Sequence, residues 1–210
     1  MKPEAMWDGI AKNWDKPGGS LGESDQKIIE KTKKYINTSA IILDYGCATG
    51  SIALEMAGIG KEVHGIDLSS KMIVTARRKA EEHKIQNVEF THGTIFDESL
   101  KQESFDVILA LNILHLLDNL PQVMNQINQL LKPGGLFVSA TPCLGEKTFV
   151  SILVNLPVFF LSKIGILPHI SFYSIPEFAR AITNENFQIV ENESLSVRPI
   201  AEHFIIAKKA

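Results

Sequence analysis

The chain has 210 residues, of which 45% are hydrophobic and 21% are charged, and its formal net charge is -3. This composition predicts one globular domain over residues 1–210 and excludes the basic surface typical of proteins that bind nucleic acids. The 2 cysteines, Cys47 and Cys143, form no C-x-x-C pair and cannot build a disulfide framework. Because the N-terminus is too polar for a signal peptide, we expect a cytoplasmic protein.

The N-terminal segment, residues 1–37, is predicted to form two helices. In the first of them, Trp7 and Trp14 recur at helical spacing. A Pro-Gly-Gly run then breaks the chain, and Ser24 is a candidate cap of the second helix. Two interpretations remain open: the tryptophans are packing anchors, or the segment is a helical lid over a site.

From residue 40 onward, apolar runs alternate with helical patterns. The runs end abruptly at turns or polar residues, which is typical of buried parallel strands. Repeated units of strand and helix predict a parallel sheet with right-handed crossovers and helices on both faces. The expected strands are Ala40–Leu43, Glu62–Ile66, Asn87–Thr91, Phe105–Leu111 and Leu136–Thr141, and the expected helices are Ile52–Ala57, Lys71–His83 and Leu120–Leu131.

A glycine-containing loop follows the first strand, where residues 41–50 read IILDYGCATG. Such a turn lets backbone N–H groups approach a ligand, and the helix N-terminus that follows favours negative charge. The alternative is an ordinary tight turn, and glycine alone does not separate the two interpretations. Evidence for a ligand site therefore has to come from other residues of the chain that would contact the same ligand.

Asp67 supplies such a partner, because it ends the second strand about twenty residues after the glycine turn. A carboxylate at this point can accept hydrogen bonds from both hydroxyls of a ribose. Its alternative role is to cap the next helix, for which Ser69 and Ser70 are also candidates. The glycine loop at this separation favours the ribose.

A basic cluster lies on the helix that follows Asp67. Arg77, Arg78 and Lys79 are adjacent there, and Glu81 and Glu82 follow them. Because acids offset the basic residues within one turn, the pattern indicates a solvated helix face.

These motifs, in this order, resemble those of class I S-adenosylmethionine-dependent methyltransferases. The stretches that carry the resemblance are ILDYGCATG, GIDLSSKM, FTHGTIFDESL, FDVILALNILHLL and LKPGG, and WDGIAKNWDK resembles the segment that precedes the core in small-molecule members. The resemblance implies an α/β, Rossmann-like, doubly wound fold with a mostly parallel seven-stranded sheet and helices on both faces. It also implies an antiparallel last strand in a hairpin, which Phe187–Ser194 and Glu202–Lys208 suit.

The resemblance further implies that the cofactor is S-adenosylmethionine and that S-adenosylhomocysteine is a product. The Gly46–Gly50 loop would pass under the methionine part, with Asp44 near its amino group and Asp67 on the ribose. The region from Asn112 to His115 would border the methyl-transfer site. The full set of cofactor-binding residues expected in this way is Asp44, Gly46, Cys47, Ala48, Thr49, Gly50, Asp67, Leu68, Met72, Gly93, Thr94, Ile95, Phe96, Asn112, Ile113 and Trp14.

Two residues depart from the family pattern. Ala48 stands where the family usually has glycine, and it would be strained at positive φ; we expect an ordinary, unstrained backbone there. Thr94 stands where many members have an acid that contacts the adenine amine. Its hydroxyl can still accept a hydrogen bond, although more weakly than a carboxylate.

Two other functions fit parts of the pattern. A NAD-dependent dehydrogenase shares the strand, the glycine turn and the acidic strand end, but it requires G-x-G-x-x-G, and this loop closes one residue early. A non-catalytic protein that binds S-adenosylmethionine on the same fold is the third possibility, because fold does not imply function.

The stretch Phe149–Pro168 is apolar and approaches the length of a membrane span. Pro157 and Lys163 interrupt it, so we expect residues 145–175 to form an apolar helical cap over an acceptor pocket instead. The predicted acceptor is therefore a small, apolar molecule. Membrane contact is expected to be peripheral at most.

The methylated atom is left open, and if the acceptor is a hydroxyl or an enolisable carbon, a base would assist the reaction; His115 is the leading candidate because it follows the fourth strand. Its alternative role is that of a helix-start residue bonded to backbone. His169 and Tyr173 are weaker candidates, and His203 is expected to be structural. The spacing of residues indicates no metal site, and it leaves the oligomeric state open.

Overall fold

The computed structural model describes residues 3–15, 21–145, 156–162, 168–196 and 202–210. The helices are α1 (Pro3–Ile10), η1 (Ala11–Asn13), α2 (Glu23–Lys33), α3 (Ser51–Ala57), α4 (Ser70–Glu82), η2 (Leu114–Leu116), α5 (Leu120–Leu130) and α7 (Ile175–Thr183), with one further helix at residues 156–162. The strands are β1 (Ile41–Tyr45), β2 (Glu62–Asp67), β3 (Val88–His92), β4 (Phe105–Leu111), β5 (Leu131–Pro142), β6 (Phe187–Ser196) and β7 (Glu202–Lys209).

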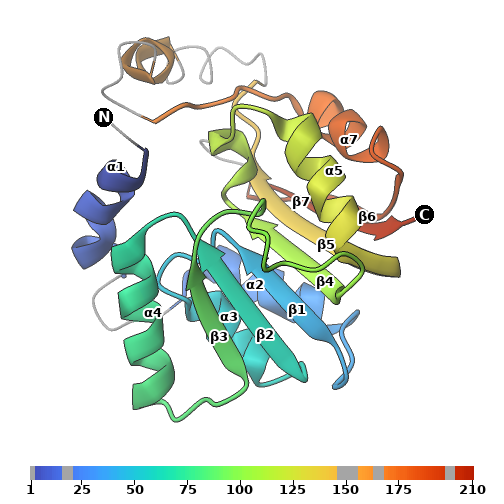
Figure 1. Ribbon diagram of the computed structural model, residues 1–210. Coiled ribbons are helices and arrows are strands. Elements are labelled where there is room, and N and C mark those ends of the chain that lie inside the picture. Colours follow the sequence, from blue (N-terminus) through green and yellow to red (C-terminus); the bar gives the residue numbers. More distant parts are fainter. Residues whose placement is uncertain (1–2, 16–20, 146–155, 163–167, 197–201) are drawn as a thin grey trace.

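These strands form one seven-stranded sheet in the order β3-β2-β1-β4-β5-β7-β6 (Figure 1). Strands β1 to β5 run parallel to one another, whereas β7 runs antiparallel to both β5 and β6. The predicted mixed sheet with its C-terminal hairpin is therefore confirmed. The hairpin inserts its second strand, β7, next to β5 and leaves β6 at the edge.

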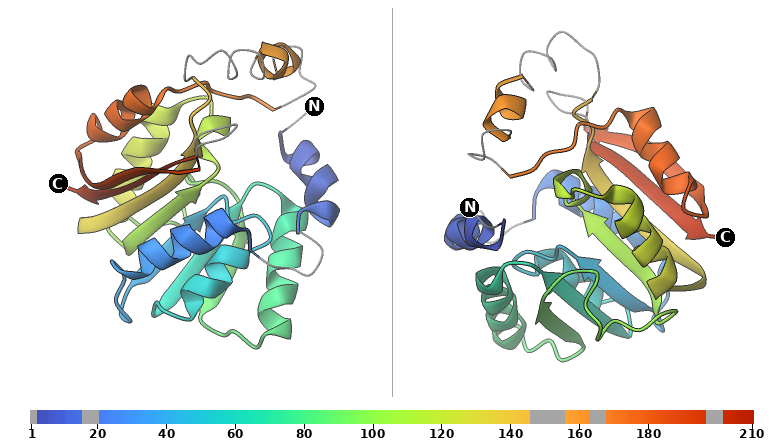
Figure 2. Two further views of the ribbon diagram at one scale, coloured as in Figure 1. Left: turned by 180° about the vertical axis from the view of Figure 1, so that it is seen from behind. Right: turned by 45° about the horizontal axis from the view of Figure 1, so that its top comes forward.

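Helices cover both faces of the sheet (Figure 2). One core cluster holds α5 and α7 against the sheet through residues such as Met124 and Phe178. The other holds α2, α3 and α4 through residues such as Ile28, Met56 and Ile73. The central strand β4 contributes to both clusters, which explains why its sequence is apolar on both faces.

Two element boundaries differ from the sequence-based prediction. Gly22, and not Ser24, caps α2: the side chain of Asp25 accepts a hydrogen bond from the Gly22 N–H, while the Ser24 hydroxyl donates to Glu202 on β7. The Lys-Pro-Gly-Gly run after α5 lies inside β5, which begins at Leu131. An irregular register between β4 and β5 accommodates this run, with Gly134 at a φ of 73°.

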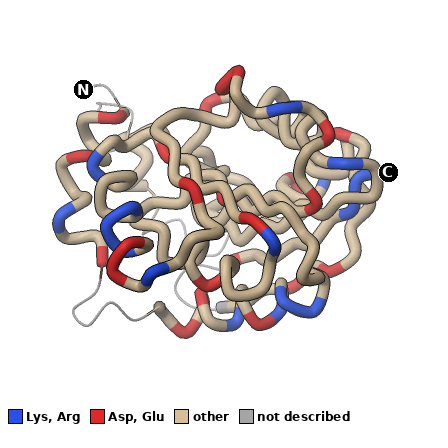
Figure 3. The backbone as a smooth tube through the Cα atoms, turned by 60° about the horizontal axis from the view of Figure 1, so that its bottom comes forward, with Lys and Arg blue, Asp and Glu red and all other residues tan. Residues whose placement is uncertain are grey.

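Ser69, one of two proposed caps of α4, is confirmed in that role because its hydroxyl accepts the Met72 N–H at 3.2 Å. Acidic and basic residues are interspersed along the chain (Figure 3), in keeping with the small net charge. The expectation that the protein binds no nucleic acid stays a prediction.

Most of the apolar stretch at residues 149–168 lies outside the described residues. The described helix at 156–162 lies at the same end of the molecule as the start of α1, apart from the sheet (Figures 1 and 2), and exposes Leu156, Phe159 and Phe160. Across the described ranges, we find no helix with the length and apolarity needed to cross a membrane. The proposed cap over residues 145–175 stays a prediction.

Candidate active site

The site lies where the strand order changes direction, between β1 and β4. In sheets of this kind, ligands bind beyond the carboxyl ends of the strands at such a point. Two cavities open there. The larger measures about 290 Å³ and contains Asp67 in its wall, and the smaller measures about 260 Å³ and contains Asp44. Both cavities are bordered by Trp14, Gly46 and Asn112, so they adjoin at these residues.

The β1–α3 loop is fixed to the end of β2. The N–H groups of Gly46 and Cys47 both donate to the Ile66 carbonyl, at 2.8 and 3.2 Å. Gly50 has a φ of 78°, and a Cβ atom there would lie 2.6 Å from the Phe90 ring. The loop therefore needs glycine at position 50 for both conformation and space. Since these N–H groups are bonded within the protein, the loop offers a ligand less backbone donor capacity than the sequence suggested.

Ala48 corrects the expectation of an unstrained backbone. Its φ is 47°, in the left-handed region where the Cβ atom of an L-residue crowds the following carbonyl. Its N–H donates to the Asp67 side chain at 2.9 Å. This hydrogen bond helps hold alanine where most family members carry glycine.

Asp67 is positioned by two backbone donors. One carboxylate oxygen accepts the Ala48 N–H at 2.9 Å, and the other accepts the Ser69 N–H at 2.8 Å. Burial raises the pKa of the Asp67 carboxyl, while the two hydrogen bonds act in the opposite direction. Asp67 does not cap α4, a role that Ser69 fills, and each of its oxygens keeps a second lone pair for a ligand hydroxyl.

Asp44 is only 3% exposed and lines the smaller cavity. Burial, together with the charge of Asp67, raises its pKa to about 7. Within the described part of the chain, its carboxylate receives no hydrogen bond. A buried carboxylate that faces a cavity without a partner suits a cationic group of a ligand.

The structure brings most of the predicted cofactor-binding residues together. The smaller cavity is lined by Trp14, Asp44, Gly46, Cys47, Ala48, Thr49 and Asn112. The larger is lined by Trp14, Gly46, Ala48, Asp67, Leu68, Met72, Gly93, Thr94, Asn112 and Ile113. Four predicted residues line neither of these two cavities: Gly50 turns the chain, Ile95 is fully buried, Phe96 is 43% exposed, and His115 lies within η2.

Among the candidate bases, His115 and His169 differ in their surroundings. Burial lowers the pKa of His115 to about 4, so its imidazole is neutral at pH 7 and a weak base. Its Nδ1 is buried and finds no partner among the described residues, and its carbonyl accepts the Ser171 N–H at 2.7 Å. His169 pairs at 3.0 Å with Asp118, a residue of the larger cavity. The role of either histidine as a base stays a prediction.

The N-terminal segment crosses this site, and sequence reasoning missed the residues that hold it. Trp7 and Trp14 line the larger cavity, and their rings pack edge to face with centroids 6.1 Å apart. On the outer side, Asp8 accepts hydrogen bonds from the Ser69 hydroxyl at 2.6 Å and from the Lys71 N–H at 3.1 Å. These bonds join residues more than sixty positions apart, which no local pattern reveals.

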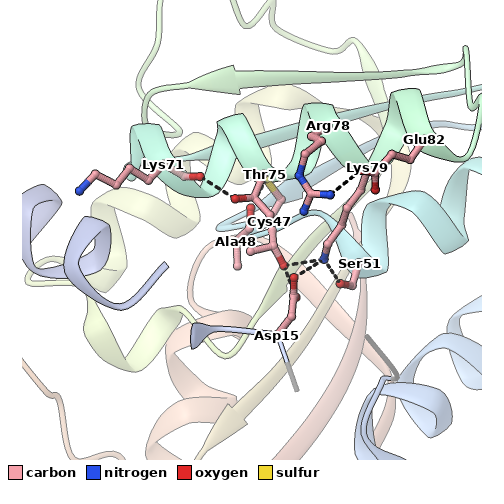
Figure 4. A network of polar contacts seen from close by, with 10 residues as sticks. Asp15, Cys47, Ala48, Ser51, Lys71, Thr75, Arg78, Lys79 and Glu82 are labelled. Atoms are coloured by element: carbon pink, nitrogen blue, oxygen red, sulfur yellow. Dashed lines mark hydrogen bonds and ion pairs between the residues drawn. The ribbon is translucent and has the colours of Figure 1, made fainter. Parts of the chain in front are cut away.

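A second missed contact is the ion pair between Lys79 and Asp15, at 2.8 Å (Figure 4). Lys79 belongs to the basic cluster that was interpreted as a solvated face. That interpretation holds for Arg78, which pairs with Glu82 in solvent, and is wrong for Lys79, whose side chain is 13% exposed.

Comparisons with known proteins give the family. A family model described as a methyltransferase domain matches residues 36–168 of the 210. The chain belongs to the class I S-adenosylmethionine-dependent methyltransferases. A ubiquinone biosynthesis O-methyltransferase from Glaesserella parasuis is 28% identical over 212 residues, which cover 95% of this chain and 89% of the relative.

Solved structures share the fold of this methyltransferase. The [4+2]-cyclase SpnF has a TM-score of 0.78 and 15% identity over 98% of this chain and 94% of its own. A geranyl diphosphate methyltransferase in complex with GPP and sinefungin has a TM-score of 0.72 and 15% identity, over 88% of this chain and 78% of its own. Because identity is this low, these likenesses show the fold alone.

Family membership decides between the functions that the sequence left open. The protein is a methyltransferase and not a dehydrogenase, and its cofactor is S-adenosylmethionine. The site is compatible with that cofactor: Asp67 and Asp44 line the two cavities, and the Asp44 carboxylate accepts no hydrogen bond from the residues that the structure describes. No group of three or more potential metal ligands occurs in the described segments.

Proposed function

We propose that this methyltransferase transfers a methyl group to an oxygen atom of a small, apolar molecule. The observation that carries the proposal is the pair of adjoining cavities, with the buried Asp44 in the wall of the smaller and Asp67, held by two backbone N–H groups, in the wall of the larger. In this arrangement the nucleoside end of S-adenosylmethionine occupies the larger cavity, and the amino-acid end occupies the smaller one.

Each part of the cofactor then meets residues of matching chemistry. Asp67 accepts the ribose hydroxyls, Leu68 and Met72 pack beside the adenine, and Thr94 offers it a hydroxyl. Asp44 pairs with the ammonium group, and ionisation of its raised-pKa carboxyl is favoured when that cation binds.

The proposed acceptor follows from the remaining wall of the larger cavity and from the relative. Trp7, Trp14, Leu116 and Leu117 give this wall an apolar character. The Glaesserella relative is named as an O-methyltransferase of ubiquinone biosynthesis. We therefore extend O-methylation, and an acceptor with an apolar body, to this chain as a proposal.

When bound, S-adenosylmethionine supplies a methyl group on a positively charged sulfur that is already electrophilic. The protein's contribution is to exclude water and to hold both reactants in line. Holding them in line can supply roughly 7–11 kcal/mol of the barrier reduction. The acceptor hydroxyl also has to lose a proton, for which His115 was the leading candidate. Contact with the wall of the larger cavity through Asp118 favours His169 instead.

The N-terminal segment and residues 145–175 would complete the site as a lid and a cap. Polar substitution of Phe159 or Phe160 should then change acceptor turnover more than cofactor affinity, because both side chains belong to the proposed cap. Equal changes in both quantities would contradict the cap. We propose a cytoplasmic location for the enzyme, with peripheral membrane contact at most.

The cofactor site is tested by Asp67→Ala. Loss of a hydrogen bond to a charged group should weaken binding of S-adenosylhomocysteine by roughly 1.5–3 kcal/mol in calorimetry. Glu55→Ala, which removes an exposed acid from α3, is the matched control. Unchanged affinity in a folded Asp67→Ala variant would remove Asp67 from the site.

The acceptor is tested by mass spectrometry. A cell extract and a panel of hydroxylated apolar compounds are incubated with isotope-labelled S-adenosylmethionine, with and without the protein. The proposal expects protein-dependent label on an oxygen atom of a small apolar product. Label that appears only on nitrogen, on carbon or on macromolecules would contradict it.

A further inference from the structure

Lys79 and Asp15 meet beside the smaller cavity in an arrangement that the proposed function has not used. The Lys79 ammonium lies 2.8 Å from one carboxylate oxygen of Asp15, and the Thr49 hydroxyl donates to the other at 2.6 Å. Lys79 also donates to the hydroxyls of Thr49 and Ser51, both at 3.0 Å. Figure 4 shows Lys79 of α4 reaching past the loop toward Asp15 and Ser51. These groups form a small carboxylate-binding site that the Asp15 carboxylate fills.

This site lies in the wall of the smaller cavity. Asp15, Thr49 and Ser51 all line that cavity, and Asp44 is in the same wall. Thr49 is 1% exposed and the Lys79 side chain is 13% exposed, so the donors are fixed in the interior. Lys79 itself does not line the cavity and adjoins it through its contacts with Asp15, Thr49 and Ser51, which do.

The charges around the cavity are one-sided. Its lining includes three acids, Asp15, Asp25 and Asp44, and no basic side chain among the described residues. The amino-acid end of S-adenosylmethionine carries both an ammonium and a carboxylate. The acids can serve the ammonium, but the carboxylate needs a cation and hydrogen-bond donors. Lys79, with Thr49 and Ser51, supplies these once Asp15 moves aside.

We propose that Lys79, Thr49 and Ser51 bind the carboxylate of S-adenosylmethionine, and that Asp15 occupies this site as an internal substitute until the cofactor displaces it. The inference rests on the proposed function, which places the amino-acid end in the smaller cavity. Replacement of one carboxylate by another keeps the Lys79 charge paired throughout, so the buried lysine is never left without a counter-ion. Asp15 thereby competes with the cofactor.

The test compares two ligands by calorimetry: S-adenosylhomocysteine, which has the amino-acid carboxylate, and 5′-methylthioadenosine, which lacks it. Lys79→Gln should lower the affinity for S-adenosylhomocysteine by about ten- to hundredfold, which is the range for a hydrogen bond to a charged group. The affinity for methylthioadenosine should not change. Lys79→Arg should restore most of the affinity. Arg78→Gln, which alters the adjacent exposed cation, is the matched control and should change neither ligand.

The variant Asp15→Asn shows whether Asp15 competes with the cofactor carboxylate or supports its binding. If Asp15 is a competitor, the variant should bind S-adenosylhomocysteine several-fold more tightly and methylthioadenosine as before. Weaker binding of S-adenosylhomocysteine to Asp15→Asn would overturn the proposal, since Asp15 would then support the ligand. An equal loss of affinity for both ligands in Lys79→Gln would also overturn it, because the ion pair would then only hold the structure together. If the unaltered protein binds neither ligand, the proposed function itself fails; if it binds both and Lys79→Gln binds them normally, only this inference fails.

Discussion

The two sides of the site are held in place by different forces. On the sheet side, Asp67 and the loop at Gly46–Gly50 are fixed by backbone hydrogen bonds and by contact with the buried core. On the N-terminal side, the segment that carries Trp7 and Trp14 is held by side-chain contacts of Asp8 and Asp15 across the rim. Backbone hydrogen bonds in a core are costly to break, whereas these side-chain contacts, which are partly buried, involve only two acids of the segment. The first side is therefore a fixed template, and the second is suited to opening.

The largest expected contrast comes from adding one methyl group to each side. Gly50→Ala places a Cβ atom 2.6 Å from the Phe90 ring at a φ of 78°. We expect it to lower the free energy of unfolding by about 2–5 kcal/mol, from strain and overpacking together.

Gly9→Ala on α1 is the counterpart, because nothing lies within 4 Å of the Cβ position there. This change should leave the free energy of unfolding the same or raise it slightly, because alanine has a higher helix propensity than glycine. Denaturant unfolding of both variants measures the contrast. A small effect of Gly50→Ala, similar to that of Gly9→Ala, would show that the loop is not a fixed template.

The second prediction concerns pH and the buried acid of the sheet side. With a pKa of about 7, Asp44 is mostly ionised at pH 8 and mostly protonated at pH 6. If its carboxylate binds the cofactor's ammonium, affinity for S-adenosylhomocysteine should fall about tenfold from pH 8 to pH 6. In Asp44→Asn the affinity should be low and lack this part of the pH dependence. An unchanged pH profile in the variant would assign the titration to another group, such as Asp67.

The sign of the stability effect follows from the same raised pKa. Between 3.8 and about 7, the folded protein holds a proton on Asp44 that the unfolded chain releases. The contribution of Asp44 to the free energy of unfolding therefore falls as pH rises through this range. Asp44→Asn should consequently be more stable than the unaltered protein at pH 8, as measured by melting temperature.

The same contrast explains what the sequence could predict. Residues 41–50 and Asp67 carry local signals, because a buried strand, a glycine turn and an acidic strand end can be recognised within about thirty residues. The Asp15–Lys79 pair carries no such signal, since it joins the bend after η1 to α4, sixty-four positions along the chain, through flexible side chains. The strain at Ala48 was also not predictable, because φ depends on how the Asp67 carboxylate holds the loop.

A third prediction tests that strain. Ala48→Gly removes a left-handed alanine but gives the unfolded chain more freedom, so the net gain in stability should be about 0.5–1 kcal/mol. Thermal unfolding of this variant should show a higher melting temperature. A decrease would mean that the Ala48 methyl group contributes packing that outweighs the strain.

The smallest effect is expected on the N-terminal side, where Asp8 joins α1 to the start of α4. Hydrogen bonds from the Ser69 hydroxyl and the Lys71 N–H lower the pKa of Asp8, so it is ionised at neutral pH. Asp8→Asn weakens these contacts without touching either cavity. We expect S-adenosylhomocysteine to dissociate a few-fold faster from this variant, with little change in stability, because only the opening of the segment is eased. Salt should accelerate dissociation from the unaltered protein more than from Asp8→Asn.

Stopped-flow fluorescence can measure this directly, because Trp7 and Trp14 are the 2 tryptophans of the chain and both belong to the N-terminal segment. Asp25→Asn is unsuitable as a control, since Asp25 lines the smaller cavity; Glu23→Gln, at an exposed position of α2, is the better choice. Equal dissociation rates in Asp8→Asn and the unaltered protein would mean that the segment does not limit release. The N-terminal side would then be as fixed as the sheet side, and the contrast between them would not extend to cofactor exchange.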